Sequence, residues 1–393
     1  MFESEEKFES EEKRREILVK TFDGLESVLA AEIEKIGGEQ IKIGKRFVSF
    51  YGNLKLVYRA NLELRTALRI LLPFTGFKAK HPNELYKKVY RIEWEKYFSV
   101  NDTFAIDPVV HSNFFTHSKF AALKTKDAIV DRFRAKFGKR PSVDTQNPTI
   151  RLGLHIDGND CTLLFDSSGE SMHKRGYRLE KTEAPLNEVL AAGMILLSGW
   201  DIKSPFIDAM CGSGTLPIEA ALIAGNIAPG LLHKHFGFMN WNNFDRTLWQ
   251  KLVSDAEDRI IIPEGKIIGS DISSKAIQIA KSNAKRAKLK DEIQFNICDF
   301  KSLKHNYEKG TMILNPPYGE RLKQNNITTF YKMIGDKLKN DFSGFDVWIF
   351  SSNKDAMKNI GLRTSKKLTL FNGPLECKFH KYEMYKGSKK HRH

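Results

Sequence analysis

The chain has 393 residues, of which 41% are hydrophobic and 28% are charged, the balance of a globular protein with proper cores. Its longest apolar runs are too short to span a bilayer, no secretory leader opens it, and its four cysteines are widely separated. This pattern argues against a membrane protein, a disulfide framework and a zinc site. We therefore expect a cytoplasmic protein without a bound metal.

Charge indicates the class of partner. The formal net charge is +15, but residues 1–13 contain six Glu and two Lys, so the rest of the chain has a net charge of +19. A surplus this large concentrates anions and adds salt-dependent affinity for phosphates. A merely basic soluble protein is the alternative, but a polyanionic partner is favoured. The acidic repeat at 1–13 and the basic tail at 387–393 are expected to be extensions without chemistry.

Residues 14–167 alternate short strands and helices, which is typical of ferredoxin-like α+β layers. Apolar periodicity predicts strands at 16–22, in a hairpin over 41–52, near 68–75, and at 103–110, 149–157 and 160–166, with helices at 25–36, 54–62, 82–97 and 118–137.

The helix at 118–137 and its exit are rich in lysine and arginine. Only Asp127 and Asp131 oppose this charge within the helix, which favours a track for phosphates over an ordinary solvated face. The apolar side chains of the helix are expected in the core; these are Phe120, Ile129, Val130 and Phe133.

The next segment, 168–185, has no apolar period and is expected to be an inter-domain linker. From 186 to 386, strict strand–helix alternation predicts a doubly wound, Rossmann-like α/β domain. Its sheet is expected to be mostly parallel and seven-stranded, with an antiparallel last strand because only a tight turn precedes it. The strands are predicted at 205–209, 266–271, 293–298, 311–315, 344–351, 366–372 and 376–385.

The first strand of this domain ends in "DAMCGSGT", residues 208–215. Gly212 and Gly214 allow a sharp turn and close approach to a ligand, and the helix after them directs its N–H groups there. A packed strand-to-helix turn would also explain the glycines. Asp208, however, favours a cationic ligand, such as the amino acid moiety of S-adenosylmethionine, over a pyrophosphate. No G-K-[ST] follows, which excludes a P-loop.

Two further acids follow strands. Asp271 ends the second strand, where a carboxylate can accept both hydroxyls of a ribose, although an N-cap would also explain it. Ile272 is placed to pack against an adenine, and Asp299 is placed to bond the adenine amine. The aromatic-rich insert at 228–252 is expected to cover the pocket. Its two histidines lack a third ligand, so they do not predict a metal site.

The fourth strand end holds "NPPYG", residues 315–319. The Asn315 side-chain oxygen and the Pro316 carbonyl can accept both hydrogens of a base amine and aim its lone pair. Pro316 and Pro317 stiffen the loop, and Tyr318 offers a ring for stacking. Methyl transfer then needs mainly positioning. These residues would also suit a plain turn. The motif, however, follows three strands that end in predicted cofactor residues, and this order favours a catalytic role.

"DAMCGSGT" followed by "NPPYG" resembles the class I S-adenosylmethionine-dependent amino-methyltransferases. More narrowly, residues 14–386 resemble the THUMP-domain RNA methyltransferases, the group that includes the bacterial 23S rRNA guanine-N2 methyltransferases. The resemblance also covers "LKTKDAIVDRFRAKFGKRPSVD", "SSGESMHKRGYR", "EAPLNEVLAA" and "NGPLECKFHKYEMY". It implies a ferredoxin-like plus THUMP RNA-binding module at 14–167, with THUMP from about 45, and a methyltransferase domain at 186–386.

The resemblance implies S-adenosylmethionine as cofactor and RNA as partner. The cofactor residues would be Asp208, Cys211, Gly212, Gly214, Thr215, Asp271, Ile272, Asp299 and Asn187, and the target-amine residues Asn315, Pro316, Pro317 and Tyr318. From the charge of the helix, its exit and the domain junction, we expect RNA to bind Lys124, Lys126, Arg132, Arg140 and Arg175, although Arg175 equally fits a brace for the linker.

The activity implied is methylation of an exocyclic base amine, most plausibly guanine N2 of 23S rRNA. Related proteins often have a second methyltransferase behind the first, and here we expect a single modification. Alternatives are a tRNA guanine-N2 methyltransferase, a DNA amino-methyltransferase acting on adenine N6 or cytosine N4, and a non-catalytic RNA-binding assembly factor. The oligomeric state stays open.

Overall fold

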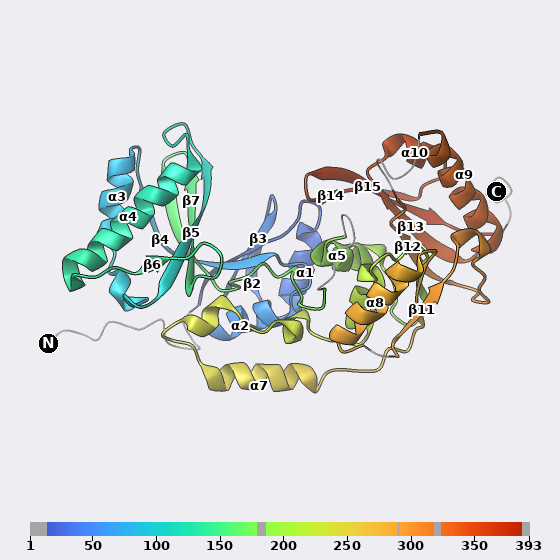
Figure 1. Ribbon diagram of the computed structural model, residues 1–393, viewed down its shortest axis with the longest axis horizontal. Helices are drawn as coiled ribbons and strands as arrows, with labels where there is room; N and C mark the ends of the chain where they lie inside the picture. The colour runs from blue at the N-terminus through green and yellow to red at the C-terminus, as the bar shows by residue number, and fades with distance from the viewer. Residues whose placement is uncertain (1–13, 179–185, 290, 318–323, 387–393) are drawn as a thin grey trace. The chain divides into compact units, whose positions relative to one another are not determined.

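The computed structural model describes residues 14–178, 186–289, 291–317 and 324–386, which form two compact units. The chain passes between the units several times. Unit 1 takes the described residues up to Thr21, then Ala30–Met172 and His233–Ser254, and unit 2 takes Phe22–Leu29, His173–Leu232 and the described residues from Asp255 on. Each unit is built on one sheet (Figure 1).

Unit 1 has an eight-stranded sheet of order β2-β3-β1-β4-β8-β7-β5-β6. Its strands are β1 (Arg15–Lys20), β2 (Glu39–Gly44), β3 (Phe47–Gly52), β4 (Arg69–Lys78), β5 (Thr103–His111), β6 (Ser142–Val143), β7 (Ile150–Asp157) and β8 (Asp160–Asp166). The long strand β4 pairs antiparallel with both β1 and β8. The ferredoxin-like strands and the later strands therefore share one continuous sheet.

The helices of this region are α1 (Glu26–Lys35), α2 (Leu54–Glu63), α3 (Pro82–Tyr90) and α4 (Ser118–Phe137). Helix α4 packs on α3 and β5 (Figure 1), and it ends at Gly138, whose φ of 68° suits a left-handed C-cap. Helix α3 is shorter than predicted. It stops at Tyr90, and the short helix η1 (Trp94–Lys96) follows, because the buried Trp94 indole donates to the Val89 carbonyl at 2.9 Å.

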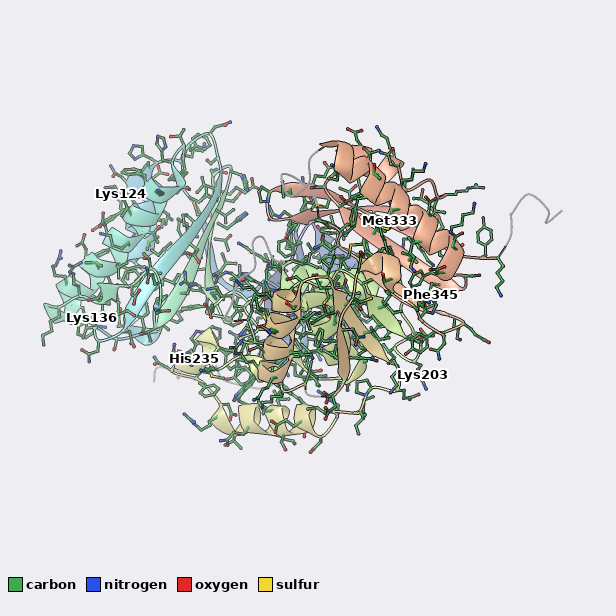
Figure 2. The ribbon with its side chains drawn as sticks, turned by 45° about the vertical axis from the view of Figure 1, so that its right-hand side comes forward. Lys124, Lys136, Lys203, His235, Met333 and Phe345 are labelled. Carbon is green, nitrogen blue, oxygen red and sulfur yellow. The ribbon has the colours of Figure 1, made fainter. Side chains whose placement is uncertain are left out.

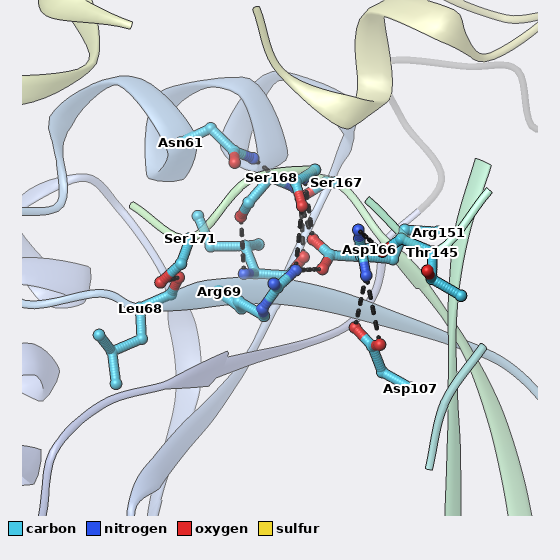
Figure 3. Close-up of polar contacts among 12 residues, drawn as sticks. Asn61, Leu68, Arg69, Asp107, Thr145, Arg151, Asp166, Ser167, Ser168 and Ser171 are labelled. Carbon is cyan, nitrogen blue, oxygen red and sulfur yellow. Dashed lines mark hydrogen bonds and ion pairs between the residues drawn. The ribbon is translucent and has the colours of Figure 1, made fainter. Parts of the chain in front are cut away.

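The segment after β8 is packed rather than loose in its described part. Arg69 forms an ion pair with the buried Asp166, and its guanidinium also donates to the Gly169 carbonyl at 3.0 Å (Figure 3). The Ser168 hydroxyl accepts the backbone N–H of Ile70 at 2.9 Å. Burial raises the pKa of Asp166, and Arg69 opposes that shift. This polar network fixes the first residues of the predicted linker to β4.

Unit 2 has a seven-stranded sheet of order β11-β10-β9-β12-β13-β15-β14. Its strands are β9 (Phe206–Asp208), β10 (Ile267–Asp271), β11 (Ile293–Ile297), β12 (Gly310–Leu314), β13 (Phe345–Ser351), β14 (Lys366–Asn372) and β15 (Leu375–Glu383). Strands β9 to β13 are parallel, whereas β15 runs antiparallel to both of its neighbours. The predicted fold class, a mostly parallel sheet with an antiparallel last strand, is confirmed.

The helices of unit 2 are α5 (Glu188–Ser198), α6 (Thr215–Ala224), α8 (Ser274–Arg286), α9 (Gln324–Asp341) and α10 (Lys354–Lys358), with short helices η2 (Pro229–Leu232) and η4 (Phe300–Ser302). All five residues of β12 are buried. Tyr331, Ile334 and Leu338 of α9 share one core cluster with β12 and β13. This core fixes the strand that leads into Asn315. Among the residues that the structure describes, no helix is long and apolar enough to cross a bilayer.

The aromatic insert belongs to unit 1 from His233 on, whereas its first residues belong to unit 2. It forms η3 (Gly237–Asn240) and α7 (Arg246–Glu257), and its Phe238 ring stacks on Tyr58 of α2 with centroids 4.4 Å apart. Trp249 meets the same ring edge-on at 6.1 Å, and the Asp245 backbone N–H donates to the Tyr58 hydroxyl at 3.0 Å. These aromatic side chains therefore contribute to the core of unit 1, and the expectation that the insert covers the cofactor pocket stays a prediction.

Candidate active site

Polar side chains follow four neighbouring strands of the unit 2 sheet. In sheet order they are Asp299, Asp271, Asp208 and Asn315, which end or follow β11, β10, β9 and β12. These strands are parallel, so their carboxyl ends meet at one edge of the sheet. The structure thus brings the predicted cofactor residues and the predicted target-amine residue to the same edge.

The glycine loop between β9 and α6 is held by the second acid. Gly212 has a φ of 51°, and its backbone N–H donates to Asp271 Oδ2 at 2.9 Å. Gly214 has a φ of 84°, and a Cβ there would lie 2.9 Å from the Ala280 methyl group. A Cβ at Gly212 would meet no atom within 4 Å. Gly214 is therefore required by packing, whereas the loop at Gly212 faces open space.

Asp208 is buried at the end of β9. Burial raises the pKa of Asp208 to about 8, and the nearby Asp271 carboxylate adds to the shift. The Met210 backbone N–H, which donates to Asp208 Oδ1 at 3.1 Å, opposes it. A carboxyl group in this setting gains strongly from a cation, so the site suits the ammonium group of an amino acid moiety.

Asp271 binds two loops at once. Its Oδ1 accepts the Ser273 backbone N–H at 2.9 Å, while its Oδ2 holds the glycine loop. The N-cap of α8 is Ser273 and not Asp271, which removes the simplest structural explanation of this acid. Asp299 is exposed and caps η4 by accepting the Lys301 N–H at 3.1 Å.

Two isoleucines are exposed beside these acids. Ile272 has 71% of its surface accessible, and Ile297, which pairs with Asp271 in the parallel ladder, has 62%. Large aliphatic side chains this exposed at the ligand edge of a sheet suit the face of an adenine. Ile272 was predicted from its place after Asp271. Ile297 was missed because an apolar residue within a predicted strand gives no sign that it will be exposed.

Asn315 stands directly after the buried strand β12. Its Oδ1 is buried and has no hydrogen-bond partner among the described residues. Such an acceptor is costly to bury unless a ligand satisfies it, so it marks a place for an N–H donor. Pro316 is buried and Pro317 is half-buried. Tyr318, the predicted stacking ring, lies outside the described residues.

The remaining predicted cofactor residues lie at the starts of two helices. Asn187 caps α5, since its Oδ1 accepts the backbone N–H groups of Val189 and Leu190 at 2.9 and 3.3 Å. Thr215 opens α6, and its hydroxyl accepts a hydrogen bond from Arg178. Cys211 is buried in the glycine loop, and burial raises the pKa of its thiol well above the ordinary value, so it is not a thiolate nucleophile.

The residues predicted to bind RNA fall into three groups. Lys124 and Arg140 of unit 1 make no ion pair among the described residues; Figure 2 labels Lys124, with Lys136 further along α4. Lys126 is paired with Asp127, and Arg132 lies 2.6 Å from Glu95. Arg175, in unit 2, is fully buried beside Glu219. The prediction of RNA contact is therefore wrong for Arg175, and the bracing alternative holds.

Two features of α4 were missed. Phe120 is 47% exposed rather than in the core, while Ile129, Val130 and Phe133 are buried as predicted. The charge of α4 is also opposed by Glu95 of η1, because Arg132 and Lys136 both bond it. Burial disfavours the charged form of Glu95, yet these two partners outweigh it and lower its pKa to about 2. A partner 37 residues away in sequence gives no local signal.

The sheet order and the residues at its carboxyl edge define a class I S-adenosylmethionine-dependent methyltransferase. The family described as "RMKL-like, methyltransferase domain" matches residues 175–381, which is more than half of the chain, and the protein belongs to this family. Residues 79–166 match the THUMP domain, and residues 16–71 match the RlmL ferredoxin-like domain. The predicted resemblance to THUMP-domain methyltransferases is confirmed. No group of three metal-ligating side chains occurs among the described residues.

Relatives cover nearly the whole chain. A Synechocystis protein named as an RNA methyltransferase, slr0064, is 40% identical over 92% of this chain and 95% of its own length. The ribosomal RNA large subunit methyltransferase K/L of Syntrophotalea carbinolica is 39% identical over 92% of this chain, which spans only 52% of that relative. The crystal structure of SMU.472 complexed with SAH has 29% identity and a TM-score of 0.85, covering 96% of this chain and all of SMU.472.

Proposed function

We propose that this protein transfers a methyl group from S-adenosylmethionine to an exocyclic amine of an RNA base, with guanine N2 of 23S rRNA as the target. The proposal rests above all on Asn315, whose buried Oδ1 lacks a partner among the described residues at the strand end beside Asp208. A base amine offers the two N–H donors that such a site needs.

The cofactor supplies a methyl group on a positively charged sulfur, which makes that carbon electrophilic. Asp208 would hold the ammonium group of its amino acid moiety, because burial leaves this carboxyl without a compensating charge. Asp271 would accept the ribose hydroxyls while it holds Gly212. Asp299 would bond the adenine amine, and Ile272 and Ile297 would cover the adenine faces. The relative SMU.472 is complexed with SAH, which supports the choice of this cofactor.

Asn315 and the Pro316 carbonyl would accept the two hydrogens of the target amine. This leaves the lone pair of the nitrogen directed at the methyl carbon and lowers its delocalisation into the ring. The amine nitrogen bonds to the methyl carbon as the carbon–sulfur bond breaks, the bonding pair stays on sulfur, and one amine proton passes to water. The protein therefore contributes positioning and exclusion of water rather than a strong base.

RNA as the substrate follows from unit 1 and from the relatives. The THUMP-matching region contains the exposed basic side chains of α4, and the slr0064 relative is named for RNA. The K/L relatives are named for the large ribosomal subunit. The chain spans about half the length of these relatives, so the large subunit is inferred from their names. Guanine N2 is inferred from the resemblance of the sequence motifs alone.

The test is label transfer from S-adenosylmethionine to three substrates: 23S rRNA from a strain that lacks this gene, tRNA from the same strain, and duplex DNA. We expect label in 23S rRNA and N2-methylguanosine in its nucleoside digest by mass spectrometry. Label in tRNA alone would favour a tRNA enzyme, and label in duplex DNA a DNA amino-methyltransferase. Binding of RNA without any binding of the cofactor would leave only a non-catalytic factor.

A further inference from the structure

Arg178 forms hydrogen bonds and an ion pair with residues from two helix starts in unit 2. Its Nη2 donates to the Thr215 hydroxyl at 2.6 Å and to the Leu186 carbonyl at 3.0 Å. Its Nη1 lies 3.4 Å from Glu188 Oε1, and the two side chains are only 11% and 5% exposed. One guanidinium therefore binds the first residue of α6 and two residues at the start of α5.

The two helix starts that Arg178 joins are those that face the cofactor edge. Thr215 follows directly on Gly214, which is the N-cap of α6 and the last glycine of the loop. Leu186 and Glu188 flank Asn187, the cap of α5. Burial raises the pKa of Glu188, and Arg178 opposes that shift, so the buried carboxylate depends on this arginine.

Neighbouring residues of the same segment hold α6 one turn further along. The Tyr177 hydroxyl donates to Glu219 Oε1 at 3.0 Å, and Arg175 Nε lies 3.5 Å from the same oxygen. Thr215 and Glu219 are four residues apart and therefore lie on one face of α6. Of these anchors, only the one at Thr215 adjoins the glycine loop.

We propose that Arg178 is a positioning residue for S-adenosylmethionine: it fixes the start of α6, with its glycine loop, relative to the start of α5, and it does not touch the cofactor. This inference rests on the proposed function, since it concerns the cofactor site of the same reaction. Arginine suits the task because its planar fork reaches several acceptors at fixed angles, which an ammonium group cannot do.

The test compares Arg178→Gln with Arg178→Lys, and Thr215→Val with Thr215→Ser. Cofactor affinity is measured by calorimetry, and KM and kcat by label transfer. We expect Arg178→Gln and Thr215→Val each to weaken cofactor binding about tenfold and to raise the KM for the cofactor equally, because each removes a charge-assisted hydrogen bond. The KM for RNA and kcat at saturation should stay within about twofold. Arg178→Lys should restore part of the affinity, and Thr215→Ser most of it.

The double variant Arg178→Gln/Thr215→Val should bind the cofactor no more weakly than Arg178→Gln alone, since Arg178→Gln already removes the hydrogen bond to Thr215. Additive losses would mean that Thr215 contacts the cofactor independently and would overturn the inference. Arg175→Gln is the matched control, because it removes a buried arginine of the same segment that bonds Glu219. It should lower the Tm without changing the KM for the cofactor.

A lower Tm of Arg178→Gln with unchanged cofactor affinity would show that Arg178 has a purely structural role. That result would overturn the inference about Arg178 but not the proposed function. The proposed function can fail separately, if the wild-type protein binds the cofactor but labels no RNA. In that case the binding series still decides the role of Arg178.

Discussion

Asp271 Oδ2 accepts the backbone N–H of Gly212 at 2.9 Å, a bond that joins the ends of two adjacent strands across 59 residues of sequence. The acid proposed to hold the ribose thus also holds the loop proposed to lie under the rest of the cofactor. One substitution at this position should disturb both.

Replacing Asp271 by Ala should weaken cofactor binding more than one lost ligand contact would. Both the Gly212 and Ser273 N–H groups lose their acceptor, so the glycine loop and the start of α8 become less fixed. We expect a loss of at least about tenfold by calorimetry, and a smaller loss for Asp271→Asn, which keeps one oxygen acceptor. Asp299→Asn is the control. A similar loss at Asp299 would argue against a special role for Asp271.

Asp208 should make the stability of the cofactor-free protein depend on pH. Its pKa is raised by burial from the ordinary value near 4 to about 8. Between these values the folded protein keeps a proton that the unfolded chain releases, so the free energy of unfolding falls as pH rises through this window. Asp208→Asn should lack this contribution and have a higher Tm than wild type at pH 8, with a smaller difference at pH 5.

The same carboxyl should release a proton when the cofactor binds at pH 7, because a cation favours its ionised form. Calorimetry in buffers of different ionisation enthalpy measures this release directly. The Asp208→Asn protein should show less proton release and weaker binding. Equal proton release in both proteins would contradict the assignment of the ammonium group to Asp208.

Asn315→Ala should separate catalysis from stability. We expect kcat to fall at least about a hundredfold, because an amine held by one acceptor fewer is poorly aimed, while cofactor affinity stays within about twofold. The Tm should not fall, since the substitution removes a buried acceptor that has no partner among the described residues. Loss of cofactor affinity equal to the loss of kcat would exclude the role proposed for Asn315.

Lys124→Glu should weaken RNA binding and flatten its salt dependence by about one unit of the logarithmic slope, as expected for one lost phosphate contact. Lys203→Glu in unit 2 is a suitable control, since it reverses the charge of an exposed lysine outside α4 that pairs with Glu264. Arg132→Glu should act differently. It leaves Lys136 as the remaining partner of Glu95 and places a like charge beside that carboxylate, so it should lower the Tm. An unchanged salt slope in Lys124→Glu would exclude α4 as a phosphate-binding surface.

Periodicity predicted the strands and most helices within a few residues, because burial of one face imposes a period on the local sequence. It also placed Asp208, Asp271 and Asn315 at strand ends, where parallel topology brings them together. The apolar periodicity could not predict which distant segments form side-chain contacts. Nothing near Arg132 shows that Glu95 will face it, and Arg175 reads as a surface cation although it is buried beside Glu219.

Helix α3 shows the same limit at a smaller scale. Its apolar pattern continues to 97, yet the Trp94 indole reaches back to the Val89 carbonyl and ends the regular helix. The insert is a second example, because its aromatic composition did not show that Phe238 and Trp249 pack on Tyr58. Composition identifies side chains that will be buried, whereas only the folded structure shows which residues they pack against.

The route of the chain through the insert has a practical consequence. Tyr58 is fully buried because Phe238 and Trp249, which come some 180 residues later, cover its ring. A fragment that ends at Met172 would therefore present this aromatic surface to solvent and should self-associate. Because the chain returns to unit 1 after entering unit 2, no single proteolytic cut separates two intact halves.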